Sequence, residues 1–288
     1  MPVLNLDKGT QLTMPELPEV ETVCRGLRPF LEGRKLTRVL KRRPDLRFPI
    51  PDDWEEQLTG QTVEAVERKA KYVVMRLTSG ISAILHLGMS GRILIHEHNA
   101  DEPFDKHDHI VFETDQGCQI RFNDPRRFGV ADIVSTDGLA ESRYFKSQGI
   151  EPLGNELSGE FIEKKFLNKK TAIKAAVLDQ KFIVGVGNIY ACESLFFAGI
   201  DPRALAGEIR GARAEALSTS IRVVLEKAIA AGGSSLNDYV QVSGELGYFQ
   251  NQWAVYGREG QKCRTCDSVI ERVVQSNRST FYCPQCQS

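Results

Sequence analysis

The sequence predicts an α+β fold in three successive parts: a β-sandwich, a helical domain and a short cysteine-rich end. Three observations support this order. Short alternating runs typical of strands fill residues 34–135, helical patterns follow from about 160 to 231, and two cysteine pairs lie near the C-terminus. A chain of 288 residues has room for two or three domains. We expect them at residues 14–150, 151–245 and 250–288, after a separate segment of residues 1–13.

An amphipathic helix over residues 18–31 is the first expected element. Pro18 suits a first helical turn, and Glu19 and Glu21 favour the positive end of the helix dipole. Gly33 ends the helix. One face is apolar, and it consists of Val20, Val23, Cys24, Leu27, Phe30 and Leu31.

Strand-rich sequence follows the helix as far as residue 135. Its alternating segments are VLKRR, TVEAVERKAKYVVMRL, ISAILHLGMSG, HIVFETDQGCQIRF and VADIVS. The DQG between two alternating runs predicts a hairpin turn. Many short strands separated by turn signals favour a sandwich or a barrel.

Helical sequence begins after EPLGNELSG, a linker at residues 151–159. We expect helices at about 160–168, 171–179, 188–198 and 212–231. Gly199 suits the position that follows the third helix. The segment VSGELGYF, residues 242–249, is expected to form a loop.

Composition and charge limit the possible classes of protein. The chain is 41% hydrophobic with a net charge of −1, and no apolar run approaches the roughly 20 residues of a membrane span. Residues 1–13 do not resemble a secretory signal, so we expect a cytoplasmic protein that has no membrane partner. From Arg25 to Arg47, nine lysines and arginines stand against two acids. Such a region is either a solvated face or a phosphate-binding face.

Four cysteines near the C-terminus have the spacing of a metal site. They form two CxxC pairs with sixteen residues between them: Cys263, Cys266, Cys283 and Cys286. Two such pairs predict one tetrahedral Zn²⁺ bound by four thiolates. Because four thiolates leave no open position, we expect the zinc to be structural and to supply folding energy to a short finger.

The segment Met14-Pro15-Glu16-Leu17-Pro18-Glu19 has a second interpretation besides a helix start. If Pro15 became the N-terminal residue, it would offer a secondary amine with a pKa near 8, partly neutral and nucleophilic at physiological pH. Glu16 and Glu19 would then be available for acid/base chemistry. From the residues alone this second interpretation is weak, because acids at the start of a helix are usually caps.

Several motifs together resemble the bacterial formamidopyrimidine-DNA glycosylases, which excise 8-oxoguanine. The motifs are PELPEVETV, KHDHI, NDPRRFG, KKTAIK, VGVGNIYACESLF and the CxxC…CxxC ending, in order from Met14 to the C-terminus. The resemblance implies an N-terminal β-sandwich, a helix–two-turn–helix domain and a C-terminal four-cysteine zinc finger. It also implies damaged double-stranded DNA as the partner, base excision, and β,δ-elimination through a Schiff base.

The resemblance also implies roles for individual residues. Pro15 is the expected nucleophile and Glu16 the acid/base, while Lys71 and Arg278 are expected to contact phosphates near the lesion. Asn188 follows two glycines at a helix start, where phosphate binding is favourable.

A second group is expected to fill the gap left by the flipped base, namely Met89, Arg126 and Phe128. By pattern alone, Met89 and Phe128 would be core residues. Further DNA contacts are expected at His86, His107 and Lys170. Glu193, in the helix after Asn188, is expected to be structural.

Residues 1–13 have no counterpart in the family. While they are attached, Pro15 nitrogen lies in an amide, which has no available lone pair. We therefore expect the working protein to lack them, with Met14 as the true start. Proteolytic release of Pro15 is a second explanation, and replacement of Pro15 by Pro2 a third, although no carboxylate follows Pro2 directly.

Other functions compete with excision of oxidised purines. An endonuclease VIII-like enzyme would share the scaffold but prefer oxidised pyrimidines, and we expect the lesion contacts in the 242–249 loop. If residues 1–13 are retained, a non-catalytic DNA binder is possible. A transcriptional zinc-ribbon factor would explain only the last thirty residues or so. A monomer is expected because DNA would fill the only large cleft.

Overall fold

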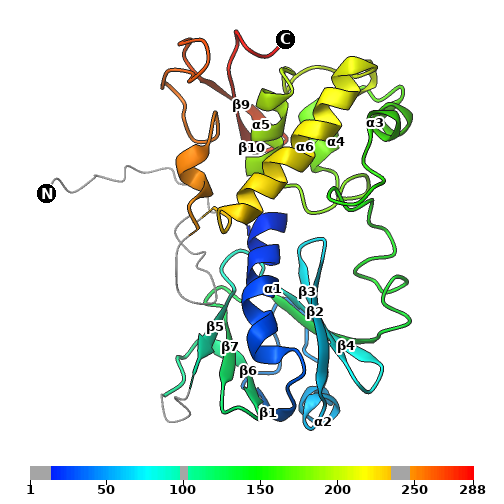
Figure 1. Ribbon diagram of the computed structural model, residues 1–288, viewed down its shortest axis with the longest axis vertical. Coiled ribbons are helices and arrows are strands. Elements are labelled where there is room, and N and C mark those ends of the chain that lie inside the picture. Colours follow the sequence, from blue (N-terminus) through cyan, green and yellow to red (C-terminus); the bar gives the residue numbers. More distant parts are fainter. Residues whose placement is uncertain (1–13, 98–102, 235–246) are drawn as a thin grey trace, which may run out of the picture.

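The computed structural model describes residues 14–97, 103–234 and 247–288. Helix α1 (Leu17–Leu31) connects two bodies (Figure 1). Most of α1 packs along the body formed by strands β1 to β8, and its first turn reaches the body formed by helices α3 to α6 with strands β9 and β10. The catalytic chemistry expected at the start of α1 therefore lies where the two bodies meet.

Two four-stranded sheets form the first body, and all neighbouring strands in them are antiparallel. One sheet has the order β1-β6-β7-β5, built from β1 (Leu36–Lys41), β6 (Asp108–Thr114), β7 (Gln119–Asn123) and β5 (Arg92–His96). The other has the order β2-β3-β4-β8, built from β2 (Val63–Lys69), β3 (Tyr72–Leu77), β4 (Ile81–His86) and β8 (Val130–Ser135).

A single core lies between the sheets, as a sandwich requires. Phe112 and Phe122 from one sheet pack in the same cluster as Val73 and Leu85 from the other. The apolar face of α1 joins this cluster, and α2 (Trp54–Leu58) packs beside β1. The predicted sandwich is confirmed.

Helices form most of the second body: α3 (Gly159–Phe166), α4 (Ile173–Leu178), α5 (Asn188–Phe197) and α6 (Ala212–Ala230), with a short 3₁₀ turn, η1 (Ala206–Glu208). α6 packs against α5, α3 and α1. Leu17 belongs to this second core, whereas Val20 belongs to the sandwich core. The first turn of α1 is thus fixed from both sides.

The C-terminal finger consists of η2 (Phe249–Gln252) and the hairpin of β9 (Glu271–Gln275) and β10 (Arg278–Tyr282). Ser276 and Asn277 turn this hairpin with positive φ angles of 49° and 59°. Val255 and Ile270 belong to the same core as the helices. The finger therefore packs against the helical domain rather than around a core of its own.

The expected helices agree with the structure to within two residues at either end. The DQG turn is also confirmed, because it joins β6 to β7 and Gly117 has a φ of +73°. Two short elements, β5 and α2, were not predicted. Among the described residues, no helix combines the length and the apolar character needed to cross a membrane.

Candidate active site

The start of α1 is buried at the junction of the two bodies. Pro15 is buried, and Glu16 is only 3% exposed. The backbone N–H of Glu16 donates a hydrogen bond of 2.9 Å to Glu19 Oε2, so the two acids are linked through the first turn of the helix. The capping interpretation and the acid/base interpretation therefore apply to the same residues.

The Glu16 carboxylate binds the N-terminus of α5. Gly187 N–H donates to Oε2 at 2.8 Å, and Ile189 N–H donates to Oε1 at 3.1 Å. Unpaired N–H groups and the helix dipole favour an anion at this position. Gly187 allows the approach, because a Cβ there would lie 2.2 Å from Glu16 Cδ.

Glu19 holds the same junction from the next turn. Its Oε1 accepts hydrogen bonds from the Tyr190 hydroxyl and, at 2.8 Å, from Ser234 N–H. In addition, Leu17 N–H donates to Gly185 O at 3.0 Å. These bonds connect α1 to α5 and to the segment after α6, so the position of Glu16 depends on both bodies.

Lys71 lies in the tight turn between β2 and β3, where Ala70 has a φ of 52°. The Glu151 carboxylate supports this turn by accepting from Ala70 N–H at 2.6 Å and from the Arg68 guanidinium at 2.8 Å. Lys71 is 7% exposed. It lies close enough to Glu16 and Arg278 for both charges to act on it.

Burial changes the acid/base properties of this pair. It raises the pKa of Glu16 to about 7, although the Lys71 ammonium favours the charged carboxylate. It also lowers the pKa of Lys71, an effect that Glu16 opposes and Arg278 reinforces. A carboxyl group with a pKa near the working pH can both donate and accept a proton.

Asn188 of α5 contacts the finger at the residue next to Arg278. The Asn188 amide donates to Ser279 O at 2.9 Å, and its buried Oδ1 has no hydrogen-bond partner among the described residues. Arg278, the neighbour of Ser279, is exposed at the start of β10. The structure therefore brings together Glu16, Lys71, Asn188 and Arg278, which come from four separate parts of the sequence.

Lys174 belongs to this contact, although the sequence analysis did not single it out. It is 1% exposed, and its ammonium donates to Ser279 O at 3.0 Å and to Thr280 Oγ1 at 2.7 Å. Lys174 follows Ile173 and precedes Ala176 and Val177, which are buried in the same helix. A lysine within an apolar helical run was the signal that could have identified it.

The residues expected to fill the gap left by a flipped base lie on two linked loops. Ser90 Oγ donates to Asp124 Oδ1 at 2.6 Å, and Gly129 N–H donates to Asp124 Oδ2 at 2.8 Å. These bonds hold the loop of Met89 beside the loop of Arg126 and Phe128. The Arg126 guanidinium lies 4.7 Å from the centre of the Phe128 ring, which is 42% exposed. Phe128 is therefore not a core residue, whereas Met89 is half-buried.

The additional DNA-contact candidates differ in position. His86 ends β4. Its ring packs at a tilt against that of Tyr72, with ring centres 4.7 Å apart, and its Nδ1 accepts from Gly88 N–H at 2.9 Å. Burial and the nearby Lys71 lower the pKa of His86 to about 4, so its ring is neutral. His107 is half-buried before β6. Lys170 is exposed between α3 and α4 and forms no ion pair within the described ranges.

The four cysteines of the finger converge as predicted. Their sulfur atoms, on Cys263, Cys266, Cys283 and Cys286, all lie within 4.8 Å of one another. Thr265 N–H and Cys286 N–H each lie 3.4 Å from a cysteine sulfur, as backbone donors do around metal-bound thiolates. The donor set and its closeness fit one structural Zn²⁺.

Glu193 fastens the segment that leads into the finger. It is fully buried in α5, and its carboxylate accepts from the N–H groups of Ala254, Val255 and Tyr256 at 2.8–3.0 Å. Three backbone donors offset the cost of burying this acid. The expectation that Glu193 is structural agrees with these contacts.

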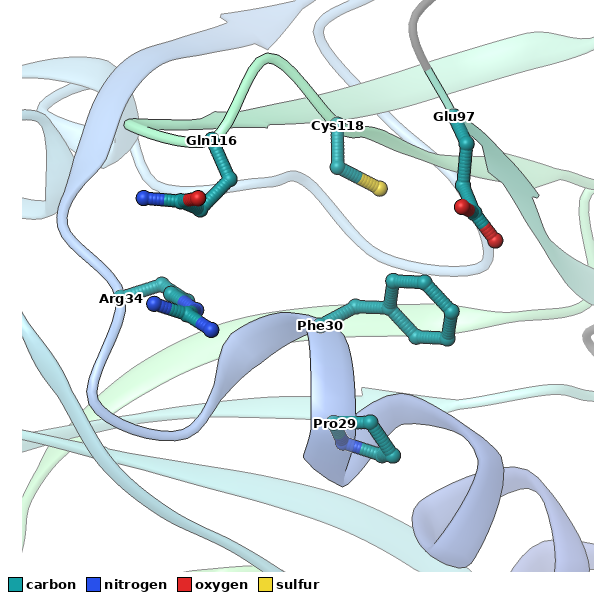
Figure 2. Close-up of a pocket in the computed structure, with 6 residues that line it drawn as sticks. All are labelled: Pro29, Phe30, Arg34, Glu97, Gln116 and Cys118. Carbon is teal, nitrogen blue, oxygen red and sulfur yellow. The ribbon is translucent and has the colours of Figure 1, made fainter.

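A cavity of about 230 Å³ lies at the opposite end of α1 (Figure 2). It is lined by Pro29, Phe30, Arg34, Glu97, Gln116 and Cys118. The 15 residues of α1 span about 20 Å, so this cavity is too remote to share a reactant with Glu16.

Residues 1–13 and residues 242–246 of the expected lesion-contact loop lie outside the described residues.

Three family models match successive parts of the sequence. Residues 14–131 match the formamidopyrimidine-DNA glycosylase N-terminal domain, residues 148–240 match the H2TH domain of the same glycosylase, and residues 260–288 match the zinc finger found in FPG and IleRS. The finger match and the sulfur cluster together support one structural zinc.

Known proteins resemble the chain over nearly its whole length. A formamidopyrimidine-DNA glycosylase of Ruegeria pomeroyi is 50% identical, over 95% of this chain and 100% of that protein. Lactococcus lactis Fpg bound to DNA containing N7-benzyl-Fapy-dG superposes with a TM-score of 0.86 at 32% identity, covering 95% of this chain and 100% of that one. The same Fpg bound to DNA containing an oxidised pyrimidine gives the same values.

Proposed function

The chain belongs to the formamidopyrimidine-DNA glycosylase family, and we propose that it excises oxidised purines from double-stranded DNA and then cuts the strand. The substrates are 8-oxoguanine and ring-opened formamidopyrimidines. The observation that carries the proposal is the buried arrangement of Pro15, Glu16 and Lys71 between the two bodies. A nucleophile, an acid/base and a cation are adjacent there, beside the finger.

Pro15 nitrogen is the proposed nucleophile. As a free N-terminal amine it attacks C1′ of the damaged nucleotide, the C1′–N bond breaks, and the base leaves with the bonding electrons and takes up a proton. The proline nitrogen then loses its proton and the C1′–O4′ bond of the sugar breaks, with O4′ taking up a proton. The resulting iminium has no N–H proton to lose, so it stays positively charged. This cation accepts electrons while the 3′ phosphate and then the 5′ phosphate leave as β- and δ-elimination products.

Glu16 is the proposed acid/base for opening the sugar ring and for elimination. Its pKa of about 7 leaves both protonation states populated near neutral pH. Lys71 and Arg278 would hold the phosphates that flank the lesion, and the Asn188 amide would add to that contact. A phosphate would offset the mutual repulsion of the two cations.

Met89, Arg126 and Phe128 are proposed to occupy the space that the flipped base leaves. The exposed Phe128 ring can replace the lost stacking, and the Arg126 guanidinium over it can bond to the base left unpaired in the opposite strand. His86, His107 and Lys170 are proposed as further contacts to the DNA backbone.

A panel of duplex oligonucleotides, each with one lesion, tests this substrate class. We expect faster cutting at 8-oxoguanine or formamidopyrimidine than at thymine glycol. The Lactococcus lactis relative in complex with an oxidised pyrimidine keeps the endonuclease VIII-like activity as the second candidate. Thymine glycol cut faster than 8-oxoguanine would overturn the purine assignment.

The proposed nucleophile requires that Pro15 carry no preceding residue. We propose that the working chain begins at Pro15 and acts as a cytoplasmic monomer whose three domains span about residues 14–150, 151–245 and 250–288. A chain that keeps residues 1–14 would bind lesions without cleaving them. Borohydride trapping separates the two forms, since only an imine is reduced to a stable protein–DNA adduct.

A further inference from the structure

A second cavity, of about 460 Å³, lies between the sandwich and the helical domain. The proposed chemistry does not use it. Its lining includes Lys69 at the end of β2, Phe145 between β8 and α3, and Phe161 and Lys165 of α3. Its volume is within the roughly 300–1,000 Å³ of small-molecule sites.

Positive charge dominates this cavity. Lys69, Lys165 and Lys181 line it, and none of the three forms an ion pair with a described carboxylate. Of the two acids in the lining, Glu151 already binds the Arg68 guanidinium at 2.8 Å. Glu156 alone remains against three lysines, so the cavity favours an anion.

Aromatic rings lie beside the same lysines. The Lys69 ammonium is 5.2 Å from the centre of the Phe145 ring, and the Lys165 ammonium is 5.9 Å from that of Phe161. Phe182 also lines the cavity, and both Phe161 and Phe182 are partly exposed. The Lys169 ammonium likewise lies 4.2 Å from the centre of the Phe182 ring. Cations beside partly exposed aromatic rings are a combination with which proteins bind a phosphate and stack its base.

We propose that this cavity binds a nucleotide, with its phosphate at Lys69, Lys165 and Lys181 and its base against Phe161 and Phe182. Two sources share this chemistry. One is a free mononucleotide. The other is a nucleotide of the substrate strand beyond the lesion. This second source rests on the proposed function.

The occupant would lie close to the catalytic elements. Lys69 is two residues before Lys71, across the Ala70 turn. Val184, in the cavity wall, precedes Gly185, whose carbonyl accepts from Leu17 N–H at 3.0 Å. A bound nucleotide would therefore stiffen the junction that holds Glu16.

Calorimetric titration of the full chain with deoxyguanosine monophosphate and with inorganic phosphate tests the free-nucleotide source. The triple variant Lys69→Gln, Lys165→Gln, Lys181→Gln should lose at least tenfold in affinity for both. Phe161→Leu should lose affinity for the nucleotide and keep that for phosphate. Lys227→Gln is the matched control, because Lys227 is an exposed lysine of α6 outside the cavity and without an ion pair in the described structure.

A second pair of titrations tests the substrate-strand source. Long and short lesion-containing duplexes are compared, and the triple variant should weaken binding of the long duplex selectively. Either selective loss supports the site. The proposal is overturned if the triple variant and Lys227→Gln bind every ligand with the same affinity, whether that affinity is unchanged or lowered equally in both. Failure of the proposed function is separate, since excision by the wild-type chain is measured independently of nucleotide binding.

Discussion

Replacing Gly187 by alanine is the sharpest perturbation of the site. The new Cβ would lie 2.2 Å from Glu16 Cδ and 2.4 Å from Oε1, whereas ordinary contacts begin at 3.4 Å. The Glu16 carboxyl must therefore retreat by about 1 Å. The hydrogen bonds from Gly187 and Ile189, now 2.8 and 3.1 Å, would then be too long to persist.

The expected cost follows from those two bonds. A hydrogen bond to a charged group contributes about 1.5–3 kcal/mol, and partial relaxation leaves a net loss of about 3 kcal/mol. For a chain of this size, that loss lowers Tm by about 5 °C. Displacing the acid/base by about 1 Å should also slow excision roughly 100-fold.

Thermal unfolding and single-turnover excision of 8-oxoguanine measure these two effects. Gly138→Ala is the control, because its Cβ would meet nothing closer than 3.7 Å. If Gly187→Ala has the same Tm and the same excision rate as Gly138→Ala, the position of the Glu16 carboxylate does not require a glycine at residue 187. That result would refute the expected effect.

Three other changes test separate parts of the site. Because the pKa of Glu16 rises from 4.5 to about 7 on folding, its stabilising contribution is complete below pH 4.5 and is lost as the pH rises through about 7. Urea unfolding should show that the free energy of unfolding falls by about 3 kcal/mol over that pH range in the wild type and not in Glu16→Gln. The same dependence of this free energy on pH in both proteins would contradict the prediction. Metal analysis should find one zinc per chain and none in Cys266→Ser, with DNA binding lost as well; stoichiometric zinc in the variant would exclude the four-thiolate site. Phe128→Ala should slow excision about 10- to 100-fold with little change in Tm, because the Phe128 side chain is 42% exposed. The control is Phe197→Ala, at a side chain that is 53% exposed, which should leave excision unchanged. Equal excision rates in the two variants would contradict the gap-filling role of Phe128.

Local patterns in the sequence were enough to predict the elements with regular spacing. The apolar face of α1 recurs at helical intervals, and two CxxC pairs bring four sulfurs together whatever the rest of the chain does. The DQG turn was visible because glycine readily adopts the positive φ that Gly117 has. These features depend on neighbours in the sequence.

Features that depend on distant residues could not be predicted in this way. Glu16 binds Gly187 across 171 positions, and no local pattern indicates that contact. The turn that carries Lys71 was hidden within a continuous strand-like run, because Ala70 adopts a positive φ without being Gly or Asn. Phe128 looked like a core residue by pattern, yet the loops fixed by Asp124 leave it exposed.

The nucleophile is tested most directly by trapping the native protein on 8-oxoguanine DNA with borohydride and locating the adduct by mass spectrometry. The predicted result is a single DNA adduct on the nitrogen of Pro15, at the N-terminus of the chain. An active protein in which Met14 is still joined to Pro15, or an adduct on another residue, would contradict the assignment of Pro15.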